Sequence, residues 1–295
     1  MKVFHHTCFA MGTRFNLVIP NMEKQRGEDL ANKATRILNE QEAIMSSYRE
    51  DSEVSKVNRY ARQQKVKLSG ELFEILKTCD QYYKKTLGAF DPALFGVTSI
   101  IKSESNSKQS IADLQSIASG WKYVLLDTNS ATIEFTGEKT GLDLGGFGKG
   151  WAMEKIIYYL VGEDVKSAFI SFGESTITAI GEHPLGGPWQ TSVPAIHNGN
   201  LPLDLSLINE SFSISGLKEK QGKNDIAGSP HIFNPGKGSI VKEDARILVK
   251  SKSAVEAEVL STALFATGDE RKIQILNTFD GIDVFECRSR GWIKK

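Results

Sequence analysis

The chain has 295 residues, of which 40% are hydrophobic and 24% are charged, and its 36 basic residues balance its 36 acidic ones. These proportions are typical of a globular protein and exclude disordered, collagen-like and coiled-coil chains. The zero net charge argues against nucleic-acid binding, because a phosphate backbone is usually met by an excess of basic residues. It does not exclude a small phosphorylated ligand, which needs only a few local charges.

Hydrophobic periodicity predicts helices and strands along the chain. Residues 13–19 alternate apolar and polar side chains, as expected of a half-buried strand. A helical pattern runs from Asp29 to Met45, and a second one covers 71–85. Further strands are predicted at 122–127, 132–135, 167–172, 245–249 and 283–286. Further helices are predicted after Gly150 and over 254–266, and polar surface loops are predicted at 103–110 and 218–224.

The order of these elements bears on the fold class. Strands and helices do not alternate strictly, so an α+β fold is favoured over a doubly wound parallel sheet. No repeat or break in composition marks a boundary, which predicts a single domain over residues 1–295.

The cysteines and the apolar segments bear on the compartment. Cys8, Cys79 and Cys287 lie far apart in sequence, which predicts reduced thiols and neither a disulfide framework nor a metal knuckle. No run of 18 apolar residues is present, so no membrane insertion is expected. The N-terminal stretch lacks the apolar core of a signal peptide. We therefore expect a cytoplasmic protein, although a removed leader would change that expectation.

The densest glycine cluster is GLDLGGFGKG, residues 141–150, just before a predicted helix. Free backbone amides at a helix N-terminus bind anions, and Lys149 adds a positive charge. The segment fits neither a Walker loop, which would need Gly in place of Asp143, nor a dinucleotide-binding loop, which would need Gly in place of Trp151. It is therefore either a tight turn or a ligand site of another kind, and Asp143 favours the ligand site.

Three weaker patterns are candidates for chemistry. Asp91, in GAFDPA (88–93), and His231, in HIFNPGKG (231–238), each precede a proline turn, which suits either a structural turn or an acid–base group. Glu258 and Thr262 lie one turn apart on a predicted helix, so their oxygens face the same way. This spacing suits a hard metal ion or, alternatively, a solvated surface.

The order of these segments along the chain resembles the FAD:protein FMN transferase family, also called ApbE, over roughly residues 9 to 285. The resemblance implies one α+β domain that binds FAD in a cleft, with Mg²⁺ at the diphosphate. Such enzymes move the FMN half of FAD to a Thr hydroxyl of an acceptor protein and release AMP, and family members are often exported. The segments are MGT (11–13), MSSYREDSEVSKVN (45–58), GAFDPA, LDLGGFGKGWAMEK (142–155), GGPW (186–189), SISG (213–216), HIFNP and AEVLSTALFATG (257–268).

The resemblance also implies roles for individual residues. The metal would be held by the Gly146 carbonyl, Glu258 and Thr262. His231 and Asp91 would be the catalytic groups, one of them helping to deprotonate the incoming threonine. The residues implied to contact the flavin nucleotide are Met11, Tyr48, Ala89, Phe90, Asp91, Asp143, Lys149, His231 and Ile232.

Several positions depart from the family pattern. Glu258 and Asn234 each stand where the family has Asp, and Glu174 replaces the second glycine of a Gly-Gly pair. Leu217 and Lys218 follow SISG, where an Asp and a Tyr are common. Because Glu is one methylene longer than Asp, either the facing loop at Gly145-Gly146 has moved back to suit Glu258 or the Mg²⁺ site is weakened, and the other departures favour a weakened site. The alternative to an active transferase is therefore a flavin-binding or scaffold homologue of the same fold that performs no transfer.

Overall fold

A computed structural model describes residues 2–103, 119–197, 199–216, 232–241 and 243–295. Its centre is an eight-stranded sheet in which all neighbouring strands are antiparallel. In spatial order the strands are β1 (Val3–Ala10), β2 (Thr13–Pro20), β6 (Ala168–Phe172), β7 (Thr176–Ile180), β10 (Glu210–Gly216), β13 (Arg246–Ser251), β14 (Asp283–Arg288) and β15 (Gly291–Lys294).

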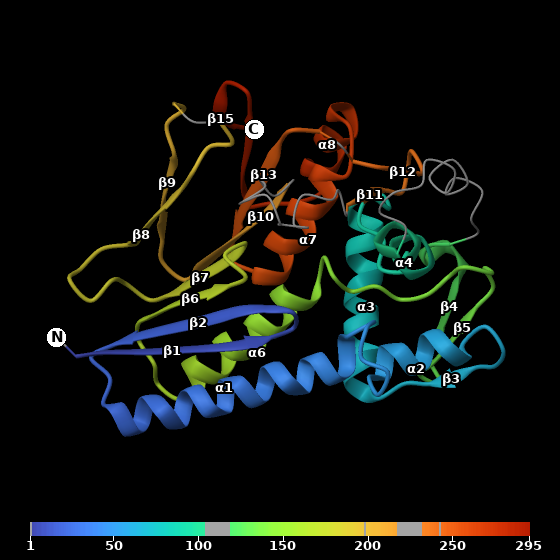
Figure 1. The fold of residues 1–295 in the computed structure, drawn as a ribbon, viewed down its shortest axis with the longest axis horizontal. Helices are drawn as coiled ribbons and strands as arrows, with labels where there is room; N and C mark the ends of the chain where they lie inside the picture. The colour runs from blue at the N-terminus through green and yellow to red at the C-terminus, as the bar shows by residue number, and fades with distance from the viewer. Residues whose placement is uncertain (1, 104–118, 198, 217–231, 242) are drawn as a thin grey trace.

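Three helices cover one face of this sheet (Figure 1). They are α1 (Lys24–Met45), α6 (Gly148–Gly162) and α7 (Ala254–Phe265). The alternation of β2 buries Phe15, Leu17 and Ile19 on this side, against Leu38 of α1 and Met153 of α6. The opposite face of the sheet packs against the hairpin of β8 (Trp189–Val193) and β9 (Leu203–Leu207).

A second group of elements stands beside the sheet, at the right of Figure 1. Its strands pair in the order β3-β5-β4, and a core that includes Leu72, Cys79 and Ile133 joins its helices to α7. The members are α2 (Glu53–Tyr60), β3 (Val66–Lys67), α3 (Gly70–Lys85), α4 (Phe95–Ser103), the 3₁₀ turn η2 (Trp121–Tyr123), β4 (Val124–Asp127) and β5 (Thr132–Phe135). Two further elements complete the described chain, the hairpin β11 (Phe233–Asn234)–β12 (Ser239–Ile240) and the helix α8 (Asp269–Leu276).

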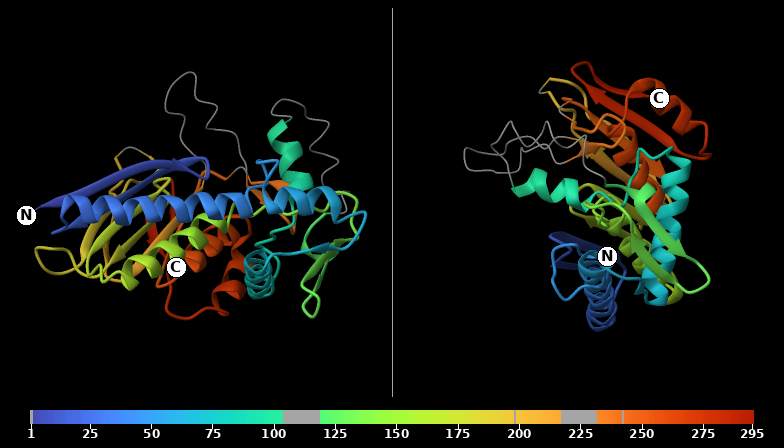
Figure 2. Two further views of the ribbon diagram at one scale, coloured as in Figure 1. Left: turned by 90° about the horizontal axis from the view of Figure 1, so that it is seen from below. Right: turned by 90° about the vertical axis from the view of Figure 1, so that its right-hand side faces the viewer.

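Helix α1 joins the two parts of the molecule. It contains 22 residues and therefore spans about 33 Å. Figure 2 shows it as one continuous helix that runs from the β1–β2 hairpin to the neighbourhood of α2.

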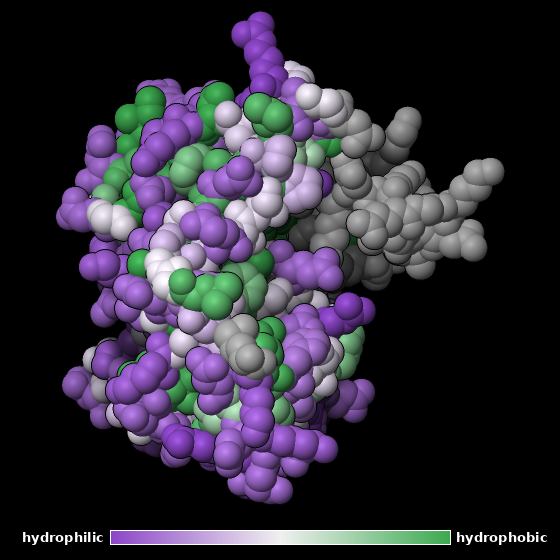
Figure 3. Space-filling model, turned by 90° about the vertical axis from the view of Figure 1, so that its left-hand side faces the viewer, coloured by the Kyte–Doolittle hydropathy of each residue, from purple (hydrophilic) through white to green (hydrophobic). Residues whose placement is uncertain are grey.

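The face shown in Figure 3 is a mixture of hydrophilic and hydrophobic residues.

Most of the predicted elements are present, and the α+β fold class is confirmed. The main correction concerns β1, which the periodicity did not predict. Its inward side chains include His6 and Cys8, which lie against Thr35 of α1, so a polar contact replaces the apolar signal. The predicted strand at 122–127 starts instead as a 3₁₀ turn. The predicted loop at 218–224 and most of that at 103–110 lie outside the described residues.

The sequence also raised the state of the cysteines and the possibility of a membrane-spanning helix. Cys79 and Cys287 are buried, Cys8 is half-buried, and all three are free thiols. Among the helices that the structure describes, none has both the length and the apolar character required to cross a membrane.

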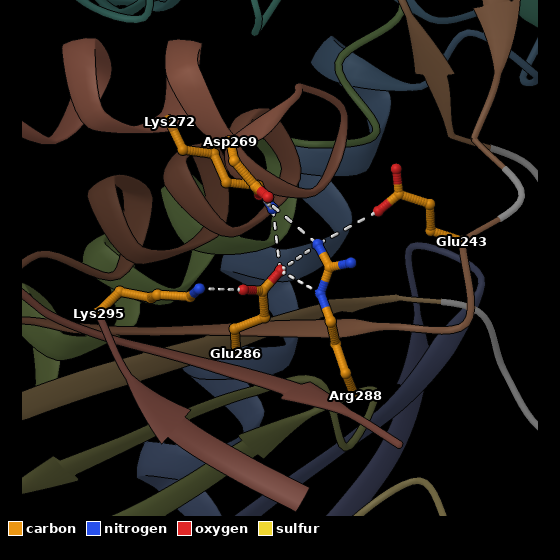
Figure 4. Close-up of polar contacts among 6 residues, drawn as sticks. All are labelled: Glu243, Asp269, Lys272, Glu286, Arg288 and Lys295. Carbon is orange, nitrogen blue, oxygen red and sulfur yellow. Dashed lines mark hydrogen bonds and ion pairs between the residues drawn. The ribbon is translucent and has the colours of Figure 1, made fainter. Parts of the chain in front are cut away.

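A charged cluster ties the C-terminal strands to α8 (Figure 4). The carboxylate of Glu286, on β14, is 1% exposed and contacts Lys272 (3.0 Å), Arg288 (2.8 Å) and Lys295 (2.6 Å). Burial by itself would raise the pKa of Glu286, but the hydrogen bonds from Lys295, Lys272 and Arg288 lower it to about 2. Lys272 also pairs with Asp269 at the start of α8.

Candidate active site

The turn between β1 and β2 lies against the start of α6. Met11 and Gly12 form this turn with positive φ angles of 49° and 73°. A methyl group added to Gly148 would lie 3.2 Å from the Met11 Cε atom, and one added to Gly173 would lie 2.8 Å from the Thr13 hydroxyl oxygen. The glycines at these two positions therefore let the β1–β2 turn, the β6–β7 turn and the α6 N-terminus meet at one end of the sheet.

The glycine-rich segment that enters α6 is held by Asn58 from α2. The Leu142 N–H donates to the Asn58 side-chain oxygen (2.6 Å), and the Asn58 side-chain amide donates to the Leu142 carbonyl (2.9 Å). Asp143 then accepts from the Gly145 N–H (3.0 Å) and from the Thr98 hydroxyl of α4 (2.6 Å). The sequence pattern does not identify Asn58 as a site residue, although it closes the segment 45–58, because nothing local indicates which backbone its side chain holds.

Glu258 occupies the N-terminus of α6. Its side chain is 2% exposed, and its carboxylate pairs with Lys149 and accepts from the Gly150 N–H. Phe147, the N-cap residue of α6, offers no side-chain hydrogen bond, so a carboxylate from α7 satisfies this helix end instead. The two residues that were predicted separately as a ligand contact, Lys149, and a metal ligand, Glu258, are thus direct partners.

The arrangement is reciprocal. Glu154 of α6 accepts hydrogen bonds from the Ser253 hydroxyl and from the Val255 N–H (3.2 Å) at the N-terminus of α7. The helices cross so closely that a methyl group on Gly150 would lie 2.6 Å from the Ala254 carbonyl oxygen. Each helix therefore supplies a carboxylate that caps the start of the other.

The remaining members of the predicted metal site are adjacent. A methyl group on Gly146 would lie 3.3 Å from the Thr262 hydroxyl oxygen, so the glycine relieves a tight contact between the loop backbone and α7. A backbone carbonyl, a hydroxyl and the carboxylate of Glu258 are hard oxygen donors, and in chemistry this set fits Mg²⁺. Within the described ranges no three His, Cys, Asp or Glu side chains form a group suited to a metal. Of the three predicted ligands, the Glu258 carboxylate is the one that carries a negative charge.

Ala89 and Phe90 form the floor beside this loop. Their exposures are 6% and 4%, and the Phe90 ring lies 6.4 Å from that of Phe147 at an angle of 30°. The Phe90 N–H donates to the Thr86 hydroxyl (3.1 Å) at the end of α3. Both residues are thus packed under the entrance to α6, and their nucleotide contact stays a prediction.

Asp91 binds backbone groups. Both of its oxygens accept from the Trp121 N–H (2.9 and 3.1 Å), and one also accepts from the Ala93 N–H (2.9 Å). Burial raises the pKa of Asp91 to about 6, against the lowering effect of these two N–H donors. The carboxylate therefore anchors the η2 turn, a task that the sequence pattern did not reveal. Its catalytic role stays a prediction.

This raised pKa makes stability depend on pH. Folded protein binds the Asp91 proton more tightly than unfolded protein, so this contribution to the free energy of unfolding is present below about pH 4 and is lost as pH rises to about 6. An Asp91→Asn variant keeps an oxygen acceptor but cannot titrate. We expect the stability difference between parent and variant to change across this interval. Urea denaturation between pH 4 and 7 measures it, and parallel pH profiles would contradict the expectation.

Three more residues were implied to contact the flavin nucleotide. Tyr48 is 64% exposed, and its turn is fixed by N–H groups of Tyr48 and Arg49 that donate to the Ser46 hydroxyl. Ile232 is half-buried against the core that contains Phe90. His231 lies outside the described residues, as do Leu217 and Lys218.

Two departures from the family pattern leave the local backbone intact. Glu174 keeps the positive φ (59°) that a glycine would adopt at its turn. Asn234, 9% exposed, accepts from the Lys237 N–H (2.9 Å) and so closes the β11–β12 hairpin. Between this hairpin and the end of α7 lies a cavity of about 100 Å³, lined in part by Val241 and Phe265.

Comparison with known proteins places these features in one family. The ApbE family profile matches residues 11–285. A protein of Chlamydia trachomatis named FAD:protein FMN transferase is 27% identical over 221 residues, which cover 72% of this chain and 68% of that protein. A Klebsiella pneumoniae protein of the same name is 23% identical over 295 residues, which cover 98% of this chain and 90% of that protein. The solved structure of the flavin transferase ApbE from Vibrio cholerae has a TM-score of 0.83 at 20% identity and covers 100% of this chain and 96% of its own. That of the Thermotoga maritima ApbE protein has a TM-score of 0.84 at 21% identity and covers 100% and 97%. The chain belongs to the ApbE family.

Proposed function

We propose that this protein is a FAD:protein FMN transferase, acting as a single domain over residues 1–295. It would move FMN from FAD to a Thr of an acceptor protein in a Mg²⁺-dependent reaction that releases AMP. The names of its relatives support flavin transfer. The observation in this chain that carries the proposal is the convergence of the α6 N-terminus, Lys149, Gly146 and Thr262 at one end of the sheet.

This convergence suits a diphosphate. The Lys149 ammonium has three N–H donors, so it can bind a diphosphate oxygen while it pairs with Glu258, and the glycine loop lets a ligand approach the backbone. When bound, Mg²⁺ would neutralise charge on the diphosphate oxygens, with Gly146, Thr262 and Glu258 as its protein ligands. Met11, Tyr48, Ala89, Phe90, Asp143 and Ile232 would contact the nucleotide.

The chemistry is a phosphoryl transfer. The acceptor Thr oxygen forms a new bond to the phosphorus of the FMN half, the bond from that phosphorus to the AMP oxygen breaks, and AMP leaves with the electron pair. The proton of the Thr hydroxyl must pass to a base. We assign this step to His231, because the Asp91 oxygens already hold the backbone of Trp121 and Ala93.

The second candidate function is flavin binding without transfer. The observation that favours it is the pairing of Glu258 with Lys149 and Gly150, which commits the carboxylate expected at the metal. Against it stand Glu174, whose backbone keeps the positive φ of its turn, and Asn234, whose side-chain oxygen closes its hairpin.

Two measurements separate these functions. AMP release from FAD, followed with an acceptor peptide that contains Thr, should require Mg²⁺ and should be accompanied by a peptide that gains the mass of FMN. A protein that binds FAD but releases no AMP would be a binding homologue. In a fluorescence titration at fixed Mg²⁺, we expect FAD to bind at least about tenfold more tightly than riboflavin, because the diphosphate adds charge-assisted hydrogen bonds. Equal affinities would contradict the diphosphate assignment.

A further inference from the structure

A row of hydroxyl groups connects the core of the sheet to Thr262. On β10, Ser213 and Ser215 face α7, where Ser261 and Thr262 lie. The Ser215 oxygen is 2.9 Å from that of Ser261 and 3.2 Å from that of Thr262, and the Ser261 oxygen is 3.3 Å from that of Ser213. Ser213 and Ser261 are fully buried, at 2% and 0% exposure. Polar groups this deeply placed are kept because they bind one another.

The direction of these hydrogen bonds follows from the number of protons. Each hydroxyl has one proton to donate. Ser261 is placed to donate its proton to the Glu258 carbonyl (3.0 Å) or to Ser213, so towards Ser215 it acts as an acceptor. Ser215 then donates its proton to Ser261, and its lone pairs face Thr262. The Thr262 hydroxyl therefore donates to Ser215.

This direction decides what the Thr262 oxygen offers. A helical Thr often donates instead to the carbonyl four residues earlier, which here is that of Glu258. Ser261 binds that same carbonyl, and Ser215 takes the Thr262 proton. The lone pairs of Thr262 are left for another partner, and the backbone of Gly146 is the nearest element of the proposed metal site.

We propose that Ser215 and Ser261 are positioning residues that orient the Thr262 hydroxyl as an acceptor of a divalent cation. This inference rests on the proposed function, because it concerns the metal ligand assigned there. It extends that function to two residues that would not themselves touch the metal. Ser215 and Ser261 set the direction of one hydroxyl and leave the glycine loop and Lys149 in place. Their replacement should therefore weaken the binding of the cation in particular.

The test uses Mn²⁺ alone as the probe, with free Mn²⁺ followed by electron paramagnetic resonance in the full-length protein. In Ser215→Ala, we expect the dissociation constant for Mn²⁺ to rise about fivefold, the effect of one hydrogen bond. Ser261→Ala should act in the same direction, because it removes the acceptor of Ser215 and frees the Glu258 carbonyl. Ser211→Ala is the matched control, since the Ser211 hydroxyl is 1% exposed on the same strand but binds Thr178 of β7 (2.7 Å), and its dissociation constant should stay within about twofold of the parent.

AMP release provides a second reading. The Mg²⁺ concentration for half-maximal release should rise about fivefold in Ser215→Ala, while the rate at saturating Mg²⁺ changes little. Unchanged Mn²⁺ affinity in Ser215→Ala and Ser261→Ala would overturn the inference, and so would an equal loss in Ser211→Ala. A parent that binds no Mn²⁺ would overturn it too. The proposed function would then be judged separately, by whether AMP release still occurs.

Discussion

Replacing Glu258 by Asp should slow AMP release at least about tenfold, which corresponds to about 1.4 kcal/mol, and lower the free energy of unfolding by about 2–3 kcal/mol. The Glu258 carboxylate reaches both the Lys149 ammonium and the Gly150 N–H from a buried position on α7. Asp carries the carboxylate about 1.5 Å less far from the helix, one carbon–carbon bond. The ammonium and the amide would then be left without their partner at the site where the diphosphate would bind.

This expectation reverses the one drawn from sequence. There, the longer Glu258 predicted a weakened metal site, which Asp would repair. The structure instead gives the longer side chain a fitted partner on α6. AMP release and urea denaturation of the parent and of Glu258→Asp test the point. Glu270→Asp, the same change at an exposed position of α8, should alter neither measurement. If Glu258→Asp is faster than the parent, the weakened-site interpretation is correct.

Glu286→Gln should lower the free energy of unfolding by about 2–3 kcal/mol at neutral pH, the second large effect. The carboxylate is buried and balances three cations, Lys272, Arg288 and Lys295 (Figure 4). An amide of the same shape removes the negative charge while the cations stay close together. Glu28→Gln is the matched control, because Glu28 pairs with Lys24 at 3.7 Å on the exposed surface of α1, where such pairs contribute little.

The sign of the pH dependence provides an independent check. The folded-state pKa of Glu286 is about 2, below the ordinary value of 4.5. Its contribution to stability is therefore present above about pH 4.5 and is lost as pH falls towards 2. The stability difference between the parent and Glu286→Gln should shrink over this interval in urea denaturation. A constant difference from neutral pH to about pH 3 would show that packing, and not charge, causes the effect.

Sequence patterns predicted the elements that bury one apolar face. Strand β2 and helix α3 have clear periodicity, and their predicted bounds agree with the structure to within a residue or two; so do the bounds of α7, which is apolar and buried on nearly all sides. Strand β1 was missed because polar side chains form part of its contact with α1. Short elements such as α2 have too few residues for a period to be recognised, and tertiary contacts define them.

For the site, the sequence indicated residues but not their partners. It selected Lys149, Glu258, Gly146 and Thr262, and the structure brings these four together around the N-terminus of α6. It did not predict that Glu258 and Lys149 would pair, since they are 109 residues apart. Nor did it predict that Asn58 would hold the glycine segment. Hydrogen bonds between distant segments leave no local periodicity, so only the fold reveals them.

The crossing of α6 and α7 limits how position 258 can vary. The two helices touch backbone to backbone at Gly150 and Ala254, and each carries a carboxylate that binds the first turn of the other. Neither helix can slide along the other without breaking both caps at once. A side chain of different length at 258 must therefore be matched by a shift of Lys149 and of the glycine segment that precedes it. Substitutions at positions 149 and 258, though on separate helices, therefore depend on each other in this chain.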